Sequence, residues 1–177
     1  IGVGALSADT TGGRAVAIGQ SALAVQNFTD STDNYNVAIG YETAKSITTG
    51  IQNTIIGALA GDALTDADYN TAVGLEALGS DTQGSRSVAI GYSTLFSQNF
   101  SSATNSFNTA VGMEAGKRIT TGTDNTLIGG IAGDSLTDAD FNTAVGTTSL
   151  GSDTLGSRST AIGYGALAAQ NFTSATD

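Results

Sequence analysis

The chain repeats a five-residue step that ends in glycine, and its clearest copy is Asn142-Thr143-Ala144-Val145-Gly146. Close copies of this step end at Gly40, Gly57, Gly74, Gly112 and Gly129. Looser copies end at Gly2, Gly19, Gly91 and Gly163. The intervals between these ten glycines are 17, 21, 17, 17, 17, 21, 17, 17 and 17 residues. One interval of 21 and three of 17 together form a super-repeat of 72 residues. Repeats of this kind indicate a stacked array in which each coil contacts its neighbours.

The composition of each coil predicts β-structure and turns. A β-branched residue precedes every step glycine, and clusters of Gly, Ser, Asp and Thr separate the steps. Such clusters supply the backbone conformations and local hydrogen bonds of turns. We therefore predict an all-β fold, a parallel β-roll or β-solenoid of ten coils, each with a length of 17 or 21, as a single array over residues 1–177. Each coil is expected to contain a strand, a bend, a short second strand and a turn.

The β-branched column is predicted to form the structural core ladder of the array. Its members are Ile18, Ile39, Ile56, Val73, Ile90, Val111, Ile128, Val145 and Ile162. The position before this column is also apolar, usually alanine, although neighbouring side chains of a strand point to opposite faces. A strand that is apolar on both faces is buried on both. Since the sequence offers no helix to cover the second face, we infer that neighbouring chains cover it.

Two further columns are predicted to be structural. The first contains the step glycines, represented by Gly40, Gly57, Gly74, Gly91, Gly112, Gly129 and Gly146. The second contains asparagines at the start of the step, represented by Asn53, Asn70, Asn125 and Asn142, with Ser87 and Ser159 in two coils. Stacked amides form hydrogen-bonded ladders in other stacked β-assemblies, so we expect a ladder here.

Composition excludes several classes of function. The chain has a formal net charge of −10 and only six scattered basic residues, which argues against nucleic acid as a partner. It has no histidine and no cysteine, which excludes Ser-His-Asp and Cys-His catalysis and disulfides. We expect no cofactor, no metal site and no membrane insertion, since the sequence has no apolar run long enough to span a bilayer. The chain begins and stops inside coils, so we expect it to be an excerpt of a longer fibrous protein.

Two groups of carboxylates leave other functions open, namely glycan hydrolysis and calcium binding. Glu42 and Glu76 occupy one column two coils apart, so the strand spacing places them ~9.6 Å from each other. This distance is near the separation of the two catalytic carboxylates in inverting glycosidases. Loss of glycan turnover on changing either to glutamine would favour a polysaccharide depolymerase. The pairs Asp66/Asp68 and Asp138/Asp140 offer oxygen ligands for calcium, but their spacing matches no EF-hand loop, and turn capping is the favoured interpretation.

The coils of 21 residues, here called long coils, carry the candidate receptor-binding residues. Each contains four additional residues, and insertions in repeat arrays map to loops that often form the binding face. The clustered aromatic and amide side chains there either contact a receptor or hold the loop in place. The candidates are Asn27, Phe28, Tyr35, Asn99, Phe100, Phe107, Asn171 and Phe172.

The step Ser87-Val88-Ala89-Ile90-Gly91-Tyr92 resembles the head repeats of trimeric autotransporter adhesins, and Asn70-Thr71-Ala72-Val73-Gly74 resembles repeats of phage and bacterial tail fibres. The resemblance implies a left-handed parallel β-roll and a homotrimer. The coils are longer than the usual head repeat, and neck, stalk and anchor segments are not seen, which leaves adhesin and fibre open.

From these observations we expect a structural and adhesive segment without enzymatic activity. It would form a rigid roll on a bacterial cell surface or a virion tail fibre, outside the cell, and present loops to a host-cell glycan or protein. Besides the depolymerase, a self-assembling extracellular filament is an alternative.

Overall fold

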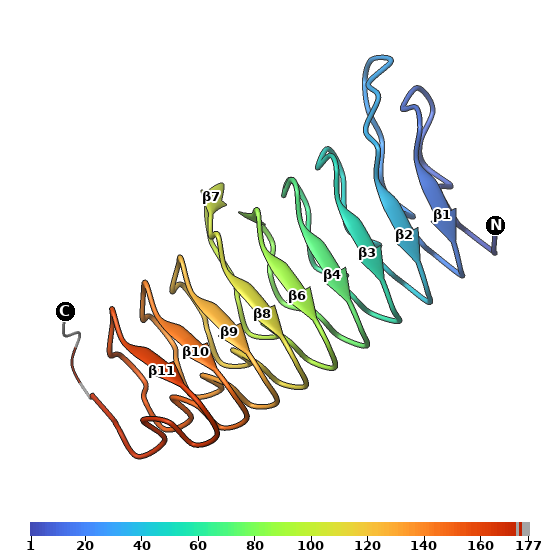
Figure 1. The fold of residues 1–177 in the computed structure, drawn as a ribbon. Helices are drawn as coiled ribbons and strands as arrows, with labels where there is room; N and C mark the ends of the chain where they lie inside the picture. Colours follow the sequence, from blue (N-terminus) through green and yellow to red (C-terminus); the bar gives the residue numbers. More distant parts are fainter. Residues whose placement is uncertain (173, 175–177) are drawn as a thin grey trace.

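The computed structural model describes residues 1–172 and residue 174, and its strands are short and parallel (Figure 1). Nine strands form one sheet in the order β1-β2-β3-β4-β6-β8-β9-β10-β11, and β5 and β7 form a second sheet. The bounds are β1 Val16–Ile18, β2 Val37–Ile39, β3 Thr54–Ile56, β4 Thr71–Val73, β5 Gly84–Ser85, β6 Val88–Ile90, β7 Thr104–Asn105, β8 Thr109–Val111, β9 Thr126–Ile128, β10 Thr143–Val145 and β11 Thr160–Ile162. The predicted parallel β-solenoid is confirmed.

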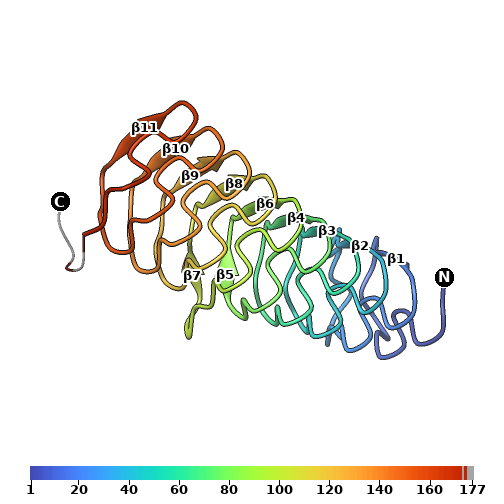
Figure 2. The ribbon, with the colours of Figure 1, turned by 90° about the horizontal axis from the view of Figure 1, so that it is seen from below.

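Each turn of the solenoid adds one strand to the same wall of the stack (Figure 2). Every step pairs in register with the next, so that Ala38 faces Ile55 and Ala110 faces Leu127. The register is unchanged across the long coils, because Ala17 pairs with Ala38 and Ala89 with Ala110. The four additional residues are therefore absorbed outside the large sheet.

The second strand predicted for each coil is mostly absent from the described residues. Only β5 and β7 pair, with an isolated bridge between Gly13 and Asp33 in the preceding super-repeat. Elsewhere, residues two and four positions after the step glycine have positive φ, as at Glu42 (51°) and Ala44 (51°). The Glu42 N–H donates to Gln20 of the preceding coil and the Ala44 N–H to Ala60 of the next. This segment is thus hydrogen-bonded along the stack without being extended.

The core lies on the opposite strand face from the one that the sequence predicted. In the large sheet, the middle residue of every strand from β2 to β11 is buried, whereas the β-branched residues before the glycines face outwards and are partly exposed. The correction applies to the whole ladder of Ile18, Ile39, Ile56, Val73, Ile90, Val111, Ile128, Val145 and Ile162. The inward residue is alanine in seven of the nine strands and the bulkier Ile55 or Leu127 in the other two.

Two kinds of coil fill the interior. In six coils a leucine stands four positions after the step glycine and a polar residue seven positions after it; these pairs are Leu6/Asp9, Leu23/Gln26, Leu78/Asp81, Leu95/Gln98, Leu150/Asp153 and Leu167/Gln170. In the other four coils, alanine or glycine occupies the first of these two positions and isoleucine or leucine the second; these pairs are Ala44/Ile47, Gly61/Leu64, Gly116/Ile119 and Gly133/Leu136. Close packing requires this exchange of volume.

Candidate interaction surface

The outward side chains of the large sheet form a β-branched surface, here called the outer face. It consists of the first and third residues of each strand in the large sheet. The first residue is threonine in six of the nine strands and valine in the other three, and the third is always valine or isoleucine. Ile90 and Ile128 are 38% and 40% exposed, whereas the middle residues of the strands from β2 to β11 in the large sheet, between the two columns, are buried. The outer face is therefore a continuous β-branched surface that the chain itself leaves uncovered.

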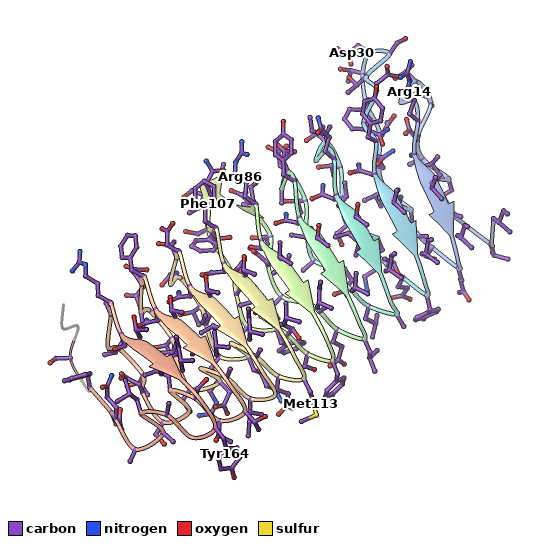
Figure 3. The ribbon with its side chains drawn as sticks, in the orientation of Figure 1. Arg14, Asp30, Arg86, Phe107, Met113 and Tyr164 are labelled. Atoms are coloured by element: carbon purple, nitrogen blue, oxygen red, sulfur yellow. The ribbon has the colours of Figure 1, made fainter. Side chains whose placement is uncertain are left out.

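A second column stands at the corner that precedes each strand, and we call it the arginine–aromatic ridge. Its residues are Arg14, Tyr35, Gln52, Tyr69, Arg86, Phe107, Asp124, Phe141 and Arg158, all exposed and all with φ between 49° and 64°. Figure 3 shows Arg14, Arg86 and Phe107 at the edge where the strands begin, with Met113 and Tyr164 at the opposite edge. The ridge and the outer face are thus different surfaces of one solenoid.

Arginines pack on the aromatic rings of the ridge. The guanidinium carbon lies 5.5 Å from the ring centre of Tyr35 for Arg14, 4.6 Å from Tyr69 for Arg86, and 5.5 Å from Phe141 for Arg158. These are cation–π distances. Arg14 also donates to the Tyr35 hydroxyl at 2.8 Å and pairs with Asp33 at 3.1 Å, while Arg86 donates to Asn105 at 3.0 Å.

The structure divides the predicted receptor-binding residues into two groups. Phe28 and Phe100 are only 6% and 5% exposed, because each ring packs over a glycine of the preceding coil, Gly12 and Gly84. The two rings hold the long loops in place. The prediction that they contact a receptor is therefore wrong.

The remaining candidates are exposed. Tyr35 and Phe107 belong to the ridge, and Phe172 is partly exposed. Asn27, Asn99 and Asn171 accept hydrogen bonds from Thr10, Thr82 and Thr154 of the preceding coil.

The asparagine column forms hydrogen bonds from coil to coil, as expected. Asn53 donates to the Ala67 carbonyl at 2.7 Å, and its own carbonyl accepts from the Asn70 N–H at 2.9 Å. The Asn125 and Asn142 amides repeat both contacts. Each amide therefore satisfies backbone groups of a neighbouring turn.

A polar network fills the interior where the asparagine column is interrupted at Ser87. The buried Gln98 amide donates to Asp81 and to the Ser87 hydroxyl, and its carbonyl accepts from Asn108 at 2.8 Å. Asp81 also accepts from the Gly84 N–H at 2.9 Å. Gln26 and Asp9, and Gln170 and Asp153, repeat the central contact. Sequence reasoning missed this network, although an Asp and a Gln recur one coil apart in all three places.

The carboxylates offered as catalytic or calcium-binding groups have local partners. Lys45 hydrogen-bonds to Glu42 at 2.7 Å and thereby lowers the pKa of this carboxyl, and the Tyr41 hydroxyl acts in the same direction. A general acid requires the opposite shift. Glu76 accepts from Ser93 at 3.1 Å.

The aspartate pairs bind groups of the preceding coil. Asp66 accepts from Thr49 and Asp68 from the Ile51 N–H, and Asp138 and Asp140 repeat these contacts with Thr121 and Thr123. In the described part of the chain, no group of three or more acidic residues is placed to hold a metal ion. The turn-capping interpretation accounts for the observed contacts.

Burial raises the pKa of Asp134 above its ordinary value. A raised pKa means that the stabilising contribution of this group is present below its unfolded pKa and is lost as the pH rises through its folded pKa. We expect Asp134→Asn to raise the melting temperature near pH 7 by no more than ~2 °C and to leave it unchanged near pH 2. Circular dichroism melts at both pH values measure this.

The matched control is Asp62, which occupies the equivalent position in the preceding super-repeat and pairs with Lys45 at 3.2 Å. Asp62→Asn removes an ion-pair partner and is expected to give no rise. A lower melting temperature for Asp134→Asn near pH 7 would contradict the prediction.

Comparisons with known proteins identify no relative: no family model, curated protein or solved structure matches the chain. Among residues 1–172 and 174, no helix has the length and apolar character needed to cross a membrane.

Proposed function

We propose that this chain is a structural and adhesive segment of a trimeric surface adhesin or tail fibre. Copies of the roll pack together through the outer face, and the edge with the long loops is presented to a glycan or protein on a host cell. The role is mechanical and adhesive rather than catalytic, and it is exerted outside the cell. The uncovered outer face carries this proposal.

The size and chemistry of the outer face support assembly with copies of the same chain. Nine strands at ~4.8 Å spacing give a face about 38 Å long. Its two columns are β-branched throughout, and charged residues are absent from the strands of the large sheet. The column of third residues, valine or isoleucine in every strand, is a contiguous apolar strip, and such surfaces mark interaction sites in soluble proteins. A repeat array also presents the same columns in every copy, which suits a symmetric assembly.

The solenoid itself suits a load-bearing role. Backbone N–H groups donate along the stack at the strand, at the following turns and at the long loops, for example Val37 to Asn53 and Thr48 to Thr65. The asparagine column and the buried Asp81–Gln98 network add side-chain hydrogen bonds between coils. A rod bonded in this way is rigid along its axis without disulfides.

The molecular mass in solution tests the proposal. Light scattering is expected to give three chains for the wild type and one chain for the double variant Ile90→Lys/Ile128→Lys, because two buried charges oppose assembly at the outer face. Both side chains are already partly exposed in the single chain, so its fold tolerates the change.

Val25→Lys is the matched control, because Val25 is exposed but lies in the turn that follows the step glycine rather than on a strand. This variant is expected to keep the wild-type mass. A monomeric wild type would contradict the proposed assembly, and a mass that grows without limit with concentration would favour the filament.

A further inference from the structure

The aromatic rings of the ridge recur in alternate coils. Tyr35, Tyr69, Phe107 and Phe141 are separated in the stack by Gln52, Arg86 and Asp124. Two coils correspond to ~9.6 Å, so the four rings span about 29 Å along one edge. A ligand that matches this edge must itself be extended and must repeat its apolar surface at the same interval.

The four rings are accessible, and three of them are held in position by an arginine. Their exposure is between 41% and 52%. Arg86 packs against Tyr69, Arg158 against Phe141, and Arg14 both packs on and donates to Tyr35. Side chains that are fixed before binding lose less conformational entropy on binding. The ridge is therefore a preorganised surface rather than a set of mobile side chains.

The chemistry of the ridge alternates between apolar and polar. The faces of an aromatic ring have negative potential, which attracts an arginine to one face of three of the rings and would likewise attract the polarised C–H groups on the flat face of a pyranose to the other. The Gln52, Arg86 and Asp124 side chains between the rings offer hydrogen-bond donors and acceptors. Two sugars of an extended β-linked glycan are about as long as two coils of the solenoid.

The charge of the protein distinguishes neutral from anionic extended polymers as ligands of the ridge. The chain carries a formal net charge of −10, and the three arginines of the ridge are outnumbered by Asp33, Asp68, Asp124 and Asp140, which stand on the ridge or within two residues of it. A polyanion would be repelled by this field. We propose that the arginine–aromatic ridge binds a neutral, extended, β-linked polysaccharide, with one ring for every two sugars. This inference rests on the adhesive part of the proposed function and names the chemical class of its ligand.

Affinity electrophoresis tests the inference with two soluble cellulose derivatives as probes. The wild type is expected to be retarded in gels that contain neutral hydroxyethylcellulose, but not in gels that contain anionic carboxymethylcellulose. The double variant Tyr69→Asn/Phe141→Asn is expected to lose most of the retardation, at least several-fold. Asparagine is chosen because it accepts the left-handed backbone that both residues have, at φ of 60° and 59°.

Two further variants separate ring chemistry from folding. Tyr69→Trp/Phe141→Trp retains aromatic faces and is expected to retain the retardation. Tyr41→Asn/Tyr92→Asn removes two equally exposed rings that directly follow step glycines, outside the ridge, and is expected to have no effect. Circular dichroism spectra that match the wild type confirm that each variant is folded.

Several outcomes would overturn the inference: no retardation of the wild type in the neutral polymer, stronger retardation in the anionic one, or equal loss in the ridge and control variants. Light scattering on the same preparations separates this result from the proposed assembly. A trimer without retardation refutes the ridge proposal alone, and a retarded monomer refutes the assembly alone.

Discussion

Gly129→Ala is expected to disrupt the solenoid, whereas Gly130→Ala is expected to be tolerated. Gly129 has a φ of 137°, and a Cβ atom there would lie 2.6 Å from the carbonyl carbon and oxygen of Gly146 in the next coil. These are backbone atoms in the stack, so no side chain can move aside. A Cβ atom at Gly130 would have no atom within 4 Å. The neighbouring glycines therefore give a matched pair.

The two substitutions are expected to change the free energy of unfolding in opposite directions. Backbone strain together with the clash makes Gly129→Ala cost at least ~4 kcal/mol of unfolding free energy. Gly130→Ala restricts the unfolded chain and is expected to stabilise the fold by about 0.4–1 kcal/mol. Urea unfolding followed by circular dichroism compares the variants. Similar midpoints for both would show that the coils are not held at the close spacing observed here.

Because the array is a stack of coupled repeats, the damage from Gly129→Ala should be greatest near the substitution. Hydrogen exchange is expected to show the largest loss of protection at β9 and β10, with less at β1 and β2. Uniform loss along the chain would instead indicate one cooperative unit. The step glycines share this geometry, with φ between 122° and 144°, which explains why every coil repeats the residue.

The sequence predicts the fold because the step spacing determines the register. The recurring intervals of 17 and 21 between the step glycines bring one step beside the next, and the four additional residues of a long coil leave the pairing intact, as the pairing of Ala89 with Ala110 shows. Parallel pairing then follows from the direction of the chain in every turn. None of this depends on the detailed packing of side chains.

The inward face of the strand was harder to predict, because a three-residue strand with apolar groups on both sides has no clear polar face. The deciding information lies outside the strand. Where Leu127 replaces alanine, Gly116 and Gly133 provide the space for it, since a Cβ atom at either glycine would lie 2.8 Å from the leucine side chain. Only the alternation of large and small residues four and seven positions after the step glycine identifies the interior.

The loop aromatics were also divided by packing that composition does not show. Phe28 and Phe107 are both aromatic residues of long coils, but one covers Gly12 and the other is exposed. The glycine that receives the ring belongs to the preceding coil and is distant from it in the sequence. The ridge was missed as a continuous surface because its aromatic, basic and amide residues share a column but no residue type.

Asn125→Ala is expected to destabilise the array by roughly 2–5 kcal/mol, because it leaves two buried backbone groups without partners. The Asn125 carbonyl accepts from the Asn142 N–H at 3.0 Å, and its amide donates to the Ala139 carbonyl at 2.7 Å. Both contacts join neighbouring coils in the buried interior. Thermal and urea unfolding measure the loss.

The conservative variant Asn125→Asp tests whether the amide acts as a two-sided bridge. Aspartate keeps the acceptor for the Asn142 N–H but loses the donor to Ala139, and it adds a buried charge. It is therefore expected to be no more stable than Asn125→Ala near pH 7 and to recover stability in acid, where the protonated carboxyl can donate. Asn99→Ala, at an exposed asparagine of a long loop, should change stability by less than ~0.5 kcal/mol. A loss at Asn125 as small as that at Asn99 would show that the ladder contributes little, and that the strand and turn hydrogen bonds alone hold the coils together.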